Sequence, residues 1–427
     1  MVCTFIGVEM ATYGLDFGTT NSSLSMNTGN SVRMIGIDPF SSNPELMRSV
    51  LFFTNGGRIF TGQSAIDQYV EDISDGRFMR SFKTLLPSQS FTTTNVGGRQ
   101  YDAVGLVTVF LTQLRQNALR VGNEVDKVVI GRPVVFSEDQ LMDQQAQDRL
   151  LQAALRAGFK EVTFQYEPIA AALLFEASLP PNQSRFVLVG DFGGGTSDFT
   201  VMRVGANRSI HRKNDILSLG GVYIGGDTFD SALMWERVGH RLGRGVKYTN
   251  NLGHRREMPE SIVNNLRHWH TISMLRDRKI RTQILDMMET ASDRQALENL
   301  DRLIDDNTGY FLFRCIEEAK CLLSSCEEAT VRFDGLVHPI SETIQRVQFE
   351  QIAAASLEKI ERCVDDTIVA SGLAIDQIDT VFLAGGTSQI PCVRRIFETK
   401  FGRDKLAQQD AFTSVAYGLG LSAGTEF

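Results

Sequence analysis

Three consecutive glycines and two aspartates stand between apolar runs in the segment LVGDFGGGTSDFTV, residues 188–201. The flanking residues are β-prone, and glycine lets a backbone turn tightly and lets another group approach closely. We therefore expect Gly193–Gly195 at the tip of a hairpin, with backbone N–H groups pointing outward. Such a tip binds phosphate, and the carboxylates of Asp191 and Asp198 could hold a divalent cation that neutralises it. A tight hairpin with a solvated aspartate is the alternative interpretation.

The chain repeats this pattern. The segment YGLDFGTTNSSLSM, residues 13–26, matches Asp16 to Asp191 and Gly18 to Gly193. Each half also has a strand that runs into a Gly or Pro turn and a helical stretch of small residues that closes the half; these are KVVIGRPVVF with TVFLAGGTSQIP, and EPIAAALLFEA with SVAYGLGLSAG. Internal repetition of this kind reports architecture. It predicts two similar lobes that face one phosphate site.

Composition bounds the class of protein. A chain of 427 residues with 42% hydrophobic residues is expected to fold into two to three domains of roughly 150 residues each. The net charge of −8 argues against a general nucleic-acid or acidic-membrane binder. The sequence has no apolar run of membrane-spanning length and lacks the basic start of a signal peptide, so we expect a cytoplasmic protein. Its six cysteines form no CxxC pair and are expected to be reduced thiols.

Five ordered motifs carry a resemblance to a known family. They are GLDFGTTNS, GDFGGGTSDF, YEPIAAALLF, LAGGTSQIP and AYGLG. They resemble the two phosphate loops, the two connecting helices and the adenosine loop of the nucleotide-binding domain of the seventy-kilodalton heat-shock (Hsp70) chaperones, within the actin and sugar-kinase superfamily. SFKTLLP is similar to the segment with the catalytic lysine, and GGVYIGGDTFD and EEAKCLLSS are similar to segments that complete the nucleotide pocket. The resemblance covers residues 13–424.

The resemblance implies an α/β fold of the actin-like ATPase type, with two pseudo-symmetric lobes, each a mixed sheet with helices, and two insert subdomains. The expected boundaries are 13–47, 124–184 and 410–427 for the core of lobe I, 48–123 for its insert, 185–230 and 326–409 for the core of lobe II, and 231–325 for its helical insert. Ser137 is expected to cap a long helix after the strand at 128–130.

The resemblance also implies the roles of individual residues in binding and hydrolysing ATP with Mg²⁺. Asp16 and Asp191 would orient the metal ion, most simply through its waters. The residues implied in catalysis are Lys83, Glu167, Asp191 and Thr196. The residues implied in binding ATP or ADP are Gly18, Thr19, Thr20, Asn21, Gly193, Gly194, Gly195, Thr196, Gly225, Gly226, Asp227, Glu317, Lys320, Ser324, Gly385, Gly386 and Thr387.

The sequence departs from the family in two places. Members usually offer two arginines that stack on the adenine, where this chain has Cys321 and Gln389. Neither side chain can stack as a guanidinium does, so weaker adenine affinity is expected. Chaperones of the family also continue into a linker and a substrate-binding domain. This chain has neither after its second connecting helix, so we expect it to resemble the stand-alone, YegD-like members.

The segment from Arg237 to Arg281 has eleven Lys or Arg residues against three Asp or Glu residues. A solvated helical lobe with basic faces is the plain interpretation of such a charge run. The alternative is a docking surface for an acidic partner, because the matching lobe in the family receives nucleotide-exchange factors. Contact with nucleic acid is a third and weaker alternative.

The sequence as a whole favours a slow Mg·ATP hydrolase whose lobes close on ATP and relax after hydrolysis, a switch that a partner reads. A small-molecule kinase on the same fold is the chief alternative, although no catalytic acid for an acceptor hydroxyl can be assigned. A nucleotide-binding scaffold with little turnover is the other.

Overall fold

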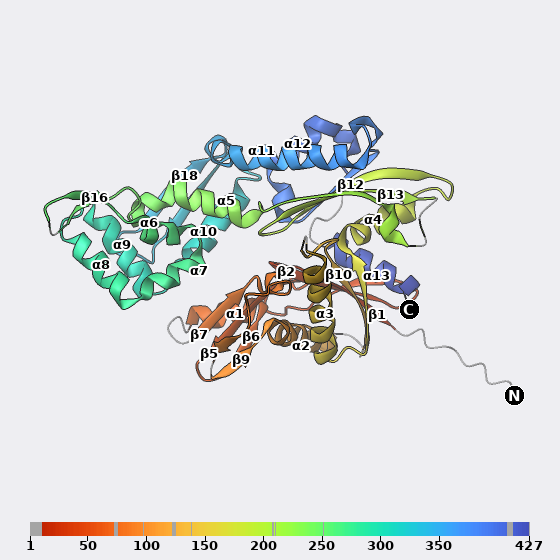
Figure 1. Ribbon diagram of the computed structural model, residues 1–427, viewed down its shortest axis with the longest axis horizontal. Helices are drawn as coiled ribbons and strands as arrows, with labels where there is room; N and C mark the ends of the chain where they lie inside the picture. The colour runs from red at the N-terminus through yellow and green to blue at the C-terminus, as the bar shows by residue number, and fades with distance from the viewer. Residues whose placement is uncertain are drawn as a thin grey trace. The chain divides into compact units, whose positions relative to one another are not determined.

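The computed structural model describes residues 11–71, 76–96, 98–121, 125–137, 139–206, 209, 211–250, 252–407 and 413–426. The chain divides into two compact units (Figure 1). Unit 1 comprises Met1–Tyr223, Arg362–Ser388 and Ile396–Phe427, and unit 2 comprises Ile224–Glu361 and Gln389–Arg395. The finer division into two lobe cores and two inserts stays a prediction.

The first sheet of unit 1 contains the first predicted phosphate hairpin. Its order is β11-β10-β1-β2-β3, with β4 paired to the end of β2. The strands are β1 (Thr12–Phe17), β2 (Asn21–Asn27), β3 (Val32–Ile35), β4 (Leu46–Arg48), β10 (Lys127–Arg132) and β11 (Glu161–Tyr166). The hairpin is antiparallel, whereas β1 pairs with β10 and β10 with β11 in parallel.

The second sheet repeats this plan in the order β14-β13-β12-β19. The strands are β12 (Ser184–Phe192), β13 (Ser197–Gly205), β14 (Ile216–Val222) and β19 (Thr380–Ala384). The hairpin of β12 and β13 again lies beside a parallel strand, β19. A parallel bridge from Val381 to Leu406 stands where β11 stands in the first sheet. The predicted duplication and the mixed sheets of an actin-like ATPase fold are therefore confirmed.

Helices and small sheets complete unit 1 and the segments next to it. The helices are α1 (Gly62–Glu71), α2 (Ala103–Val121), α3 (Gln140–Arg156), α4 (Glu167–Ser178), α12 (Pro391–Phe401) and α13 (Ser414–Glu426), with a 3-10 helix η1 (Phe82–Leu85). The small sheets join β5 (Val50–Thr54) to β6 (Ile59–Thr61) and β7 (Gly76–Arg80), and β8 (Thr94–Val96) to β9 (Arg99–Tyr101).

The two helices that close the halves cross over. Although α4 follows the first sheet, Phe175 stacks edge-on against Phe382 of β19, at 5.1 Å between ring centroids. Although α13 follows the second sheet, it packs against β1, β2 and β10 of the first, where the Ser25 hydroxyl donates a 2.6 Å hydrogen bond to the Ala416 carbonyl oxygen. Each half therefore uses the other's closing helix.

Glycines let α13 approach closely. A Cβ added at Gly418 would lie 1.8 Å from the carbonyl oxygen of Ala170 on α4, and one added at Gly14 would lie 2.3 Å from the Gly420 nitrogen. Backbone atoms cannot yield as a flexible side chain can. The small residues in both helical stretches thus serve helix packing.

Unit 2 contains all of the predicted second insert, residues 231–325. Among the described residues of the whole chain, no helix is long and apolar enough to cross a membrane. The elements of unit 2 are α5 (Gly226–Leu233), β15 (Lys247–Thr249), β16 (Arg255–Glu257), α6 (Glu260–Val263), α7 (Trp269–Ile272), α8 (Arg278–Met288), α9 (Arg294–Asp305), α10 (Gly309–Leu322), β17 (Glu328–Phe333), β18 (Ile340–Gln345) and the first part of α11 (Arg346–Ser371).

The expected cap of α3 was wrong by two residues. Asp139, and not Ser137, is the N-cap, and its carboxylate accepts hydrogen bonds from the backbone nitrogens of Leu141 and Met142. Ser137 instead accepts a hydrogen bond from the Asp139 nitrogen. Both types cap helices well, and the carboxylate adds a favourable charge at the positive end of the helix dipole.

Replacing Gly14 with alanine tests the close approach of α13. We expect Gly14→Ala to lower the free energy of unfolding by about 1–3 kcal/mol, because the new methyl group must displace backbone. Urea unfolding measures this loss. Gly56→Ala is the control, since its nearest atom would lie 3.8 Å away, and an equal loss in both variants would contradict the packing argument.

Candidate functional site

An ion pair in unit 1 joins two of the four residues that the resemblance implied in catalysis. Lys83 Nζ lies 3.0 Å from Glu167 Oε1, and the side chains are 10% and 11% exposed. Lys83 belongs to η1, whose Phe82 is buried against Phe17 and Phe110 with ring centroids 6.0 and 5.4 Å away. The buried ring fixes η1, and this in turn carries the lysine to Glu167.

Glu167 is the first residue of α4. Tyr166 is its N-cap and Pro168 follows it, a residue well suited to a first helical turn. A carboxylate is favoured at this end of a helix. Gly131 of β10 leaves room for the side chain, because a Cβ there would lie 3.2 Å from Glu167 Cγ.

Asp16 and Asp191 occupy equivalent places at the ends of β1 and β12, and both have perturbed titration. Burial raises the pKa of Asp16 to about 7, and the charge of Glu167 adds to the rise. Burial raises the pKa of Asp191 well above its usual value, helped by Glu167 and Asp16. Burial lowers the pKa of Lys83, but the carboxylates of Glu167, Asp16 and Asp191 outweigh burial and raise it overall. In the part of the chain that the structure describes, the cluster therefore has one positive group, Lys83, for three carboxyl groups.

The first hairpin loop is held from behind by Ser49, a residue that the sequence analysis missed. Ser49 donates from its hydroxyl to the Gly18 carbonyl oxygen at 2.7 Å and from its nitrogen to the Thr20 carbonyl oxygen at 2.8 Å. A Cβ at Gly18 would lie 2.2 Å from the Asn21 carbonyl oxygen, so the turn requires glycine. The paired strands end at Phe17 and Ser22, so residues 18–21 form the turn that the sequence predicted. Ser49 binds two of the carbonyl groups of this turn.

The second hairpin turns in the same register. Phe192 pairs with Ser197, as Phe17 pairs with Ser22, and residues 193–196 make the turn. The Gly193 nitrogen donates to the Thr196 carbonyl oxygen at 2.9 Å, and the Thr196 hydroxyl donates to Asp198 at 3.0 Å. Gly193 and Gly195 are exposed, so the tip is open to a ligand.

The adenosine-loop glycines lie next to this hairpin within unit 1. β19 pairs with β12 so that Ala384 is opposite Asp191, and Gly385 follows with a φ of +83°. A Cβ at Gly385 would lie 2.1 Å from the Phe192 carbonyl oxygen, so only glycine allows this approach. Gly386 and the buried Thr387 continue into a 3-10 helix.

The remaining predicted nucleotide residues lie in unit 2. Gly225 is the N-cap of α5, so Gly226 and Asp227 form its first turn. Lys320 on α10 is buried, and its Nζ lies 2.8 Å from Asp230 Oδ1 and 3.2 Å from the Gly226 carbonyl oxygen. The lysine therefore binds the start of α5. Glu317 lies on the same helix, three residues before Lys320, and Ser324 follows the helix.

The predicted site residues thus form two groups, one within each unit. In unit 1 they are Asp16, Lys83, Glu167, Asp191, the two hairpin loops and the loop from Gly385 to Thr387; in unit 2 they are Gly225–Asp227, Glu317, Lys320 and Ser324. Of the described residues, no three His, Cys, Asp or Glu side chains converge closely enough to bind a metal ion directly. Asp16 and Asp191 suit an ion that keeps its waters.

Much of the basic segment in unit 2 is satisfied internally. Arg237, His240 and Arg241 lie within 4.0 Å of Glu342, and Arg281 pairs with Asp301 and Asp305. The Trp235 ring has the guanidinium of Arg267 at 3.7 Å and that of Arg244 at 4.7 Å.

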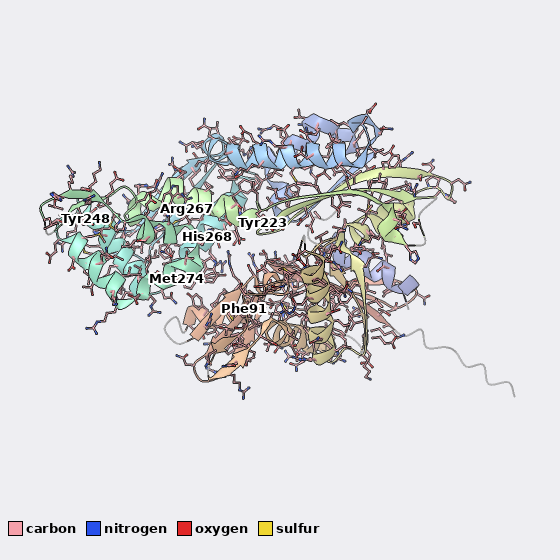
Figure 2. All side chains as sticks on the ribbon, viewed as in Figure 1. Phe91, Tyr223, Tyr248, Arg267, His268 and Met274 are labelled. Atoms are coloured by element: carbon pink, nitrogen blue, oxygen red, sulfur yellow. The ribbon has the colours of Figure 1, made fainter. Side chains whose placement is uncertain are left out.

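Arg276, Arg278 and Lys279 are exposed around the start of α8 and form no ion pair with any described residue. Figure 2 labels Tyr248, Arg267, His268 and Met274 in the same unit. The basic surface is therefore smaller than the charge count suggests.

Comparison with known proteins gives a consistent result. The family model described as Hsp70 protein matches residues 12–241 and 281–425. A chaperone protein DnaK of Thermosipho africanus is 23% identical over 412 residues, 96% of this chain and 58% of the relative. Chaperone proteins of the same name from Thermotoga neapolitana and Cyanidioschyzon merolae are each 24% identical, over 97% and 96% of this chain and 60% and 61% of their own lengths. The chain spans about three fifths of the curated relatives it matches.

Removing one carboxylate from the cluster is expected to stabilise the ligand-free protein. Because the pKa of Asp191 is raised on folding, the Asp191 carboxyl group lowers the free energy of unfolding as pH rises above about 4. Asp191→Asn removes this pH-dependent loss of stability. We expect a gain in unfolding free energy at pH 8, where the carboxyl group of the parent protein is driven to ionise, and a smaller gain at pH 4.5. Urea unfolding at both pH values measures it, with exposed Asp286→Asn as control. Destabilisation at pH 8 would contradict the charge argument.

Proposed function

This chain belongs to the Hsp70 protein family, and from that premise we propose that it binds Mg·ATP and slowly hydrolyses it to ADP and phosphate, as a chaperone-like nucleotide switch. The observation that carries the proposal is the Lys83–Glu167 ion pair, together with the carboxyl groups of Asp16 and Asp191, whose pKa values are raised. Two glycine hairpins of matching register accompany it, and the tip of the second is exposed at Gly193 and Gly195.

The chemistry assigns a role to each group. Backbone N–H groups of the loops 18–21 and 193–196 would bind the β and γ phosphates. The ammonium group of Lys83 would stabilise negative charge on the transferring phosphoryl group. Glu167, fixed at the start of α4, and Asp191 would accept hydrogen bonds from the attacking water, and Thr196 would stand beside it. Phosphoryl transfer depends on this positioning more than on covalent chemistry.

The donor set fits a hydrated magnesium ion. Asp16 and Asp191 supply hard oxygen donors, and the residues that the structure describes offer no three-carboxylate cage. Mg²⁺ would neutralise phosphate charge and relieve the carboxylate repulsion that, after burial, raises the pKa values of both aspartates. Lys83 is already engaged by Glu167, so an added cation suits the cluster.

The base side is proposed to bind weakly. Lys320 is engaged by Asp230 and the start of α5, and we propose that Glu317 and Ser324 of the same segment approach the ribose and base. Cys321 is exposed and offers no planar cation for stacking. We propose that phosphate and metal contacts supply most of the affinity, and that the protein is cytoplasmic.

We also propose that an acidic partner, such as a nucleotide-exchange protein, binds the unpaired cations at the start of α8. Reversing the charge of Arg276 and Arg278 together should weaken binding of a fluorescent polyglutamate peptide by about tenfold at low salt. Arg294→Glu is the control, because Arg294 already pairs with Glu298 at 2.9 Å. Equal affinity in the wild type and the double variant, by fluorescence anisotropy, would exclude this surface.

Single-turnover release of phosphate from Mg·ATP, with no acceptor present, tests the hydrolysis proposal. We expect slow release that falls by about 100-fold or more in Glu167→Gln, because the attacking water loses its acceptor. ATP affinity should change little, since Glu167 acts on the water. Glu358→Gln, at an exposed position on α11, is the matched control.

The outcomes separate the alternatives. Tight ATP binding without release would contradict hydrolysis and favour the nucleotide-binding scaffold. Release that appears only with an added hydroxyl compound would favour the small-molecule kinase. Release that survives in Glu167→Gln would remove Glu167 from the mechanism.

A further inference from the structure

Arg132 is a buried cation that the proposed chemistry does not use. It is the last residue of β10 and only 7% exposed. Its guanidinium lies over two aromatic rings, 5.0 Å from the centroid of Phe136 and 5.5 Å from that of Tyr166. A buried charge is costly unless it is fully paired, so this placement needs a compensating set of contacts.

Helix α3 supplies those contacts. Arg132 Nη2 donates to both carboxylate oxygens of Asp143 at 2.9 Å, and Nη1 donates to Gln147 Oε1. Arg132 Nε also donates to the Pro133 carbonyl oxygen at 3.0 Å. Asp143 and Gln147 are four residues apart and so share one face of α3. A planar guanidinium that is paired and stacked in this way has one allowed orientation.

The orientation of Arg132 matters because of its neighbour across the sheet. In the parallel register of β10 and β11, Arg132 lies opposite Tyr166. Tyr166 is the N-cap residue of α4, its side chain makes no capping hydrogen bond, and Glu167 follows directly. The stacked ring therefore fixes the start of α4 at the point where Glu167 turns to Lys83.

The same helix reaches the other member of the ion pair. Arg149 of α3 donates from Nη1 to the carbonyl oxygens of Leu86 and Ser88, at 2.6 and 2.9 Å. Those groups directly follow η1, which carries Lys83. Lys83 and Glu167 are 84 positions apart in the chain, yet the segments that carry them are both held by side chains that belong to α3 or contact it.

We propose that Arg132 is a positioning residue for Glu167: it holds the N-terminus of α4 so that the carboxylate meets Lys83 at the distance that water activation needs. This inference rests on the proposed hydrolysis. Among the described residues, Arg132 itself makes no contact with the site: its partners are Phe136, Tyr166, Asp143, Gln147 and nearby carbonyl groups.

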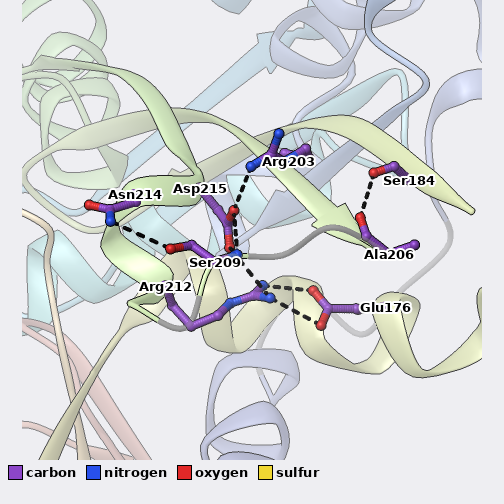
Figure 3. Close-up of polar contacts among 8 residues, drawn as sticks. All are labelled: Glu176, Ser184, Arg203, Ala206, Ser209, Arg212, Asn214 and Asp215. Carbon is purple, nitrogen blue, oxygen red and sulfur yellow. Dashed lines mark hydrogen bonds and ion pairs between the residues drawn. The ribbon is translucent and has the colours of Figure 1, made fainter.

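The opposite end of α4 offers a matched control. Arg212 donates to both oxygens of the buried Glu176, at 3.2 and 2.7 Å, and lies 3.6 Å from the buried Asp215 (Figure 3). Arg212 anchors α4 directly through a partly buried ion pair, whereas Arg132 pairs with α3 and reaches the start of α4 through the Tyr166 ring. Glu176 lies nine residues beyond Glu167, so Arg212 can stabilise the helix without orienting its first residue.

The experiment compares Arg132→Met with Arg212→Met in the full chain. We expect Arg132→Met to slow single-turnover phosphate release by about 10- to 100-fold while the ATP dissociation constant changes by less than about threefold, as for a misplaced catalytic group. Arg212→Met should lose stability in urea but keep its rate. In a Glu167→Gln background, Arg132→Met should slow the residual release by less than about twofold, because the group that it positions is absent.

Arg132→Lys separates charge from orientation. Lysine keeps the charge beside Asp143 but cannot stack between two rings, so we expect stability to recover more than rate. Equal slowing in Arg132→Met and Arg212→Met, or a full further loss of rate in the Glu167→Gln background, would overturn the inference. If the wild type releases no phosphate, the proposed function fails, and the inference about Arg132 is then tested by the urea midpoints of the Arg132→Met, Glu167→Gln and double variants. Additive shifts in midpoint would overturn the inference, and non-additive shifts would support it.

Discussion

The balance of charge around Lys83 is the constraint on which the rest of the site depends. One buried ammonium group faces Glu167 at 3.0 Å and interacts with Asp16 and Asp191, whose pKa values are raised by burial and by the charge of Glu167. Such a cluster is unfavourable in the ligand-free protein. It persists because the surrounding elements hold it, and it becomes favourable when a cation and a phosphate group bind.

The duplicated sheets explain how the two aspartates come to equivalent places. Each stands at the end of a strand whose hairpin partner returns in the same register, and each strand has a parallel neighbour. The crossed helices α4 and α13 then join the halves of unit 1 through glycine contacts that leave no room for a Cβ. Glu167, the proposed catalytic carboxylate, is the first residue of α4, so the packing of this helix sets the position of the proposed chemistry.

Local patterns in the sequence were enough for the hairpins, the strand at Thr380–Ala384 and the two small-residue helices, because strands, turns and such helices depend on near neighbours. The parallel pairing of this strand and the crossing of the helices are long-range features that these patterns did not predict. The Lys83–Glu167 pair spans 84 positions, and only the family resemblance pointed to it. The sequence analysis did not single out Ser49 or Arg132, because a serine behind a loop and an arginine between two rings have no local pattern. Two good caps two residues apart made Ser137 and Asp139 hard to tell apart.

In the basic segment, residues 237–281, the sequence predicted more exposed charge than the structure shows. Its charge count overstates its free surface, because most partners of Arg237, Arg241 and Arg281 lie far away in the chain. Sequence patterns give the sum of the charges, whereas the fold decides which of them face solvent.

Calorimetric titration of ATP into the protein, with Mg²⁺ and with the metal chelated, tests the central claim most directly. If the carboxylates of Asp16 and Asp191 hold a hydrated cation over the Lys83–Glu167 pair, ATP affinity should fall by about tenfold or more without Mg²⁺, because unscreened phosphate charge would meet the carboxylate cluster. Equal affinity with and without Mg²⁺ would contradict the account.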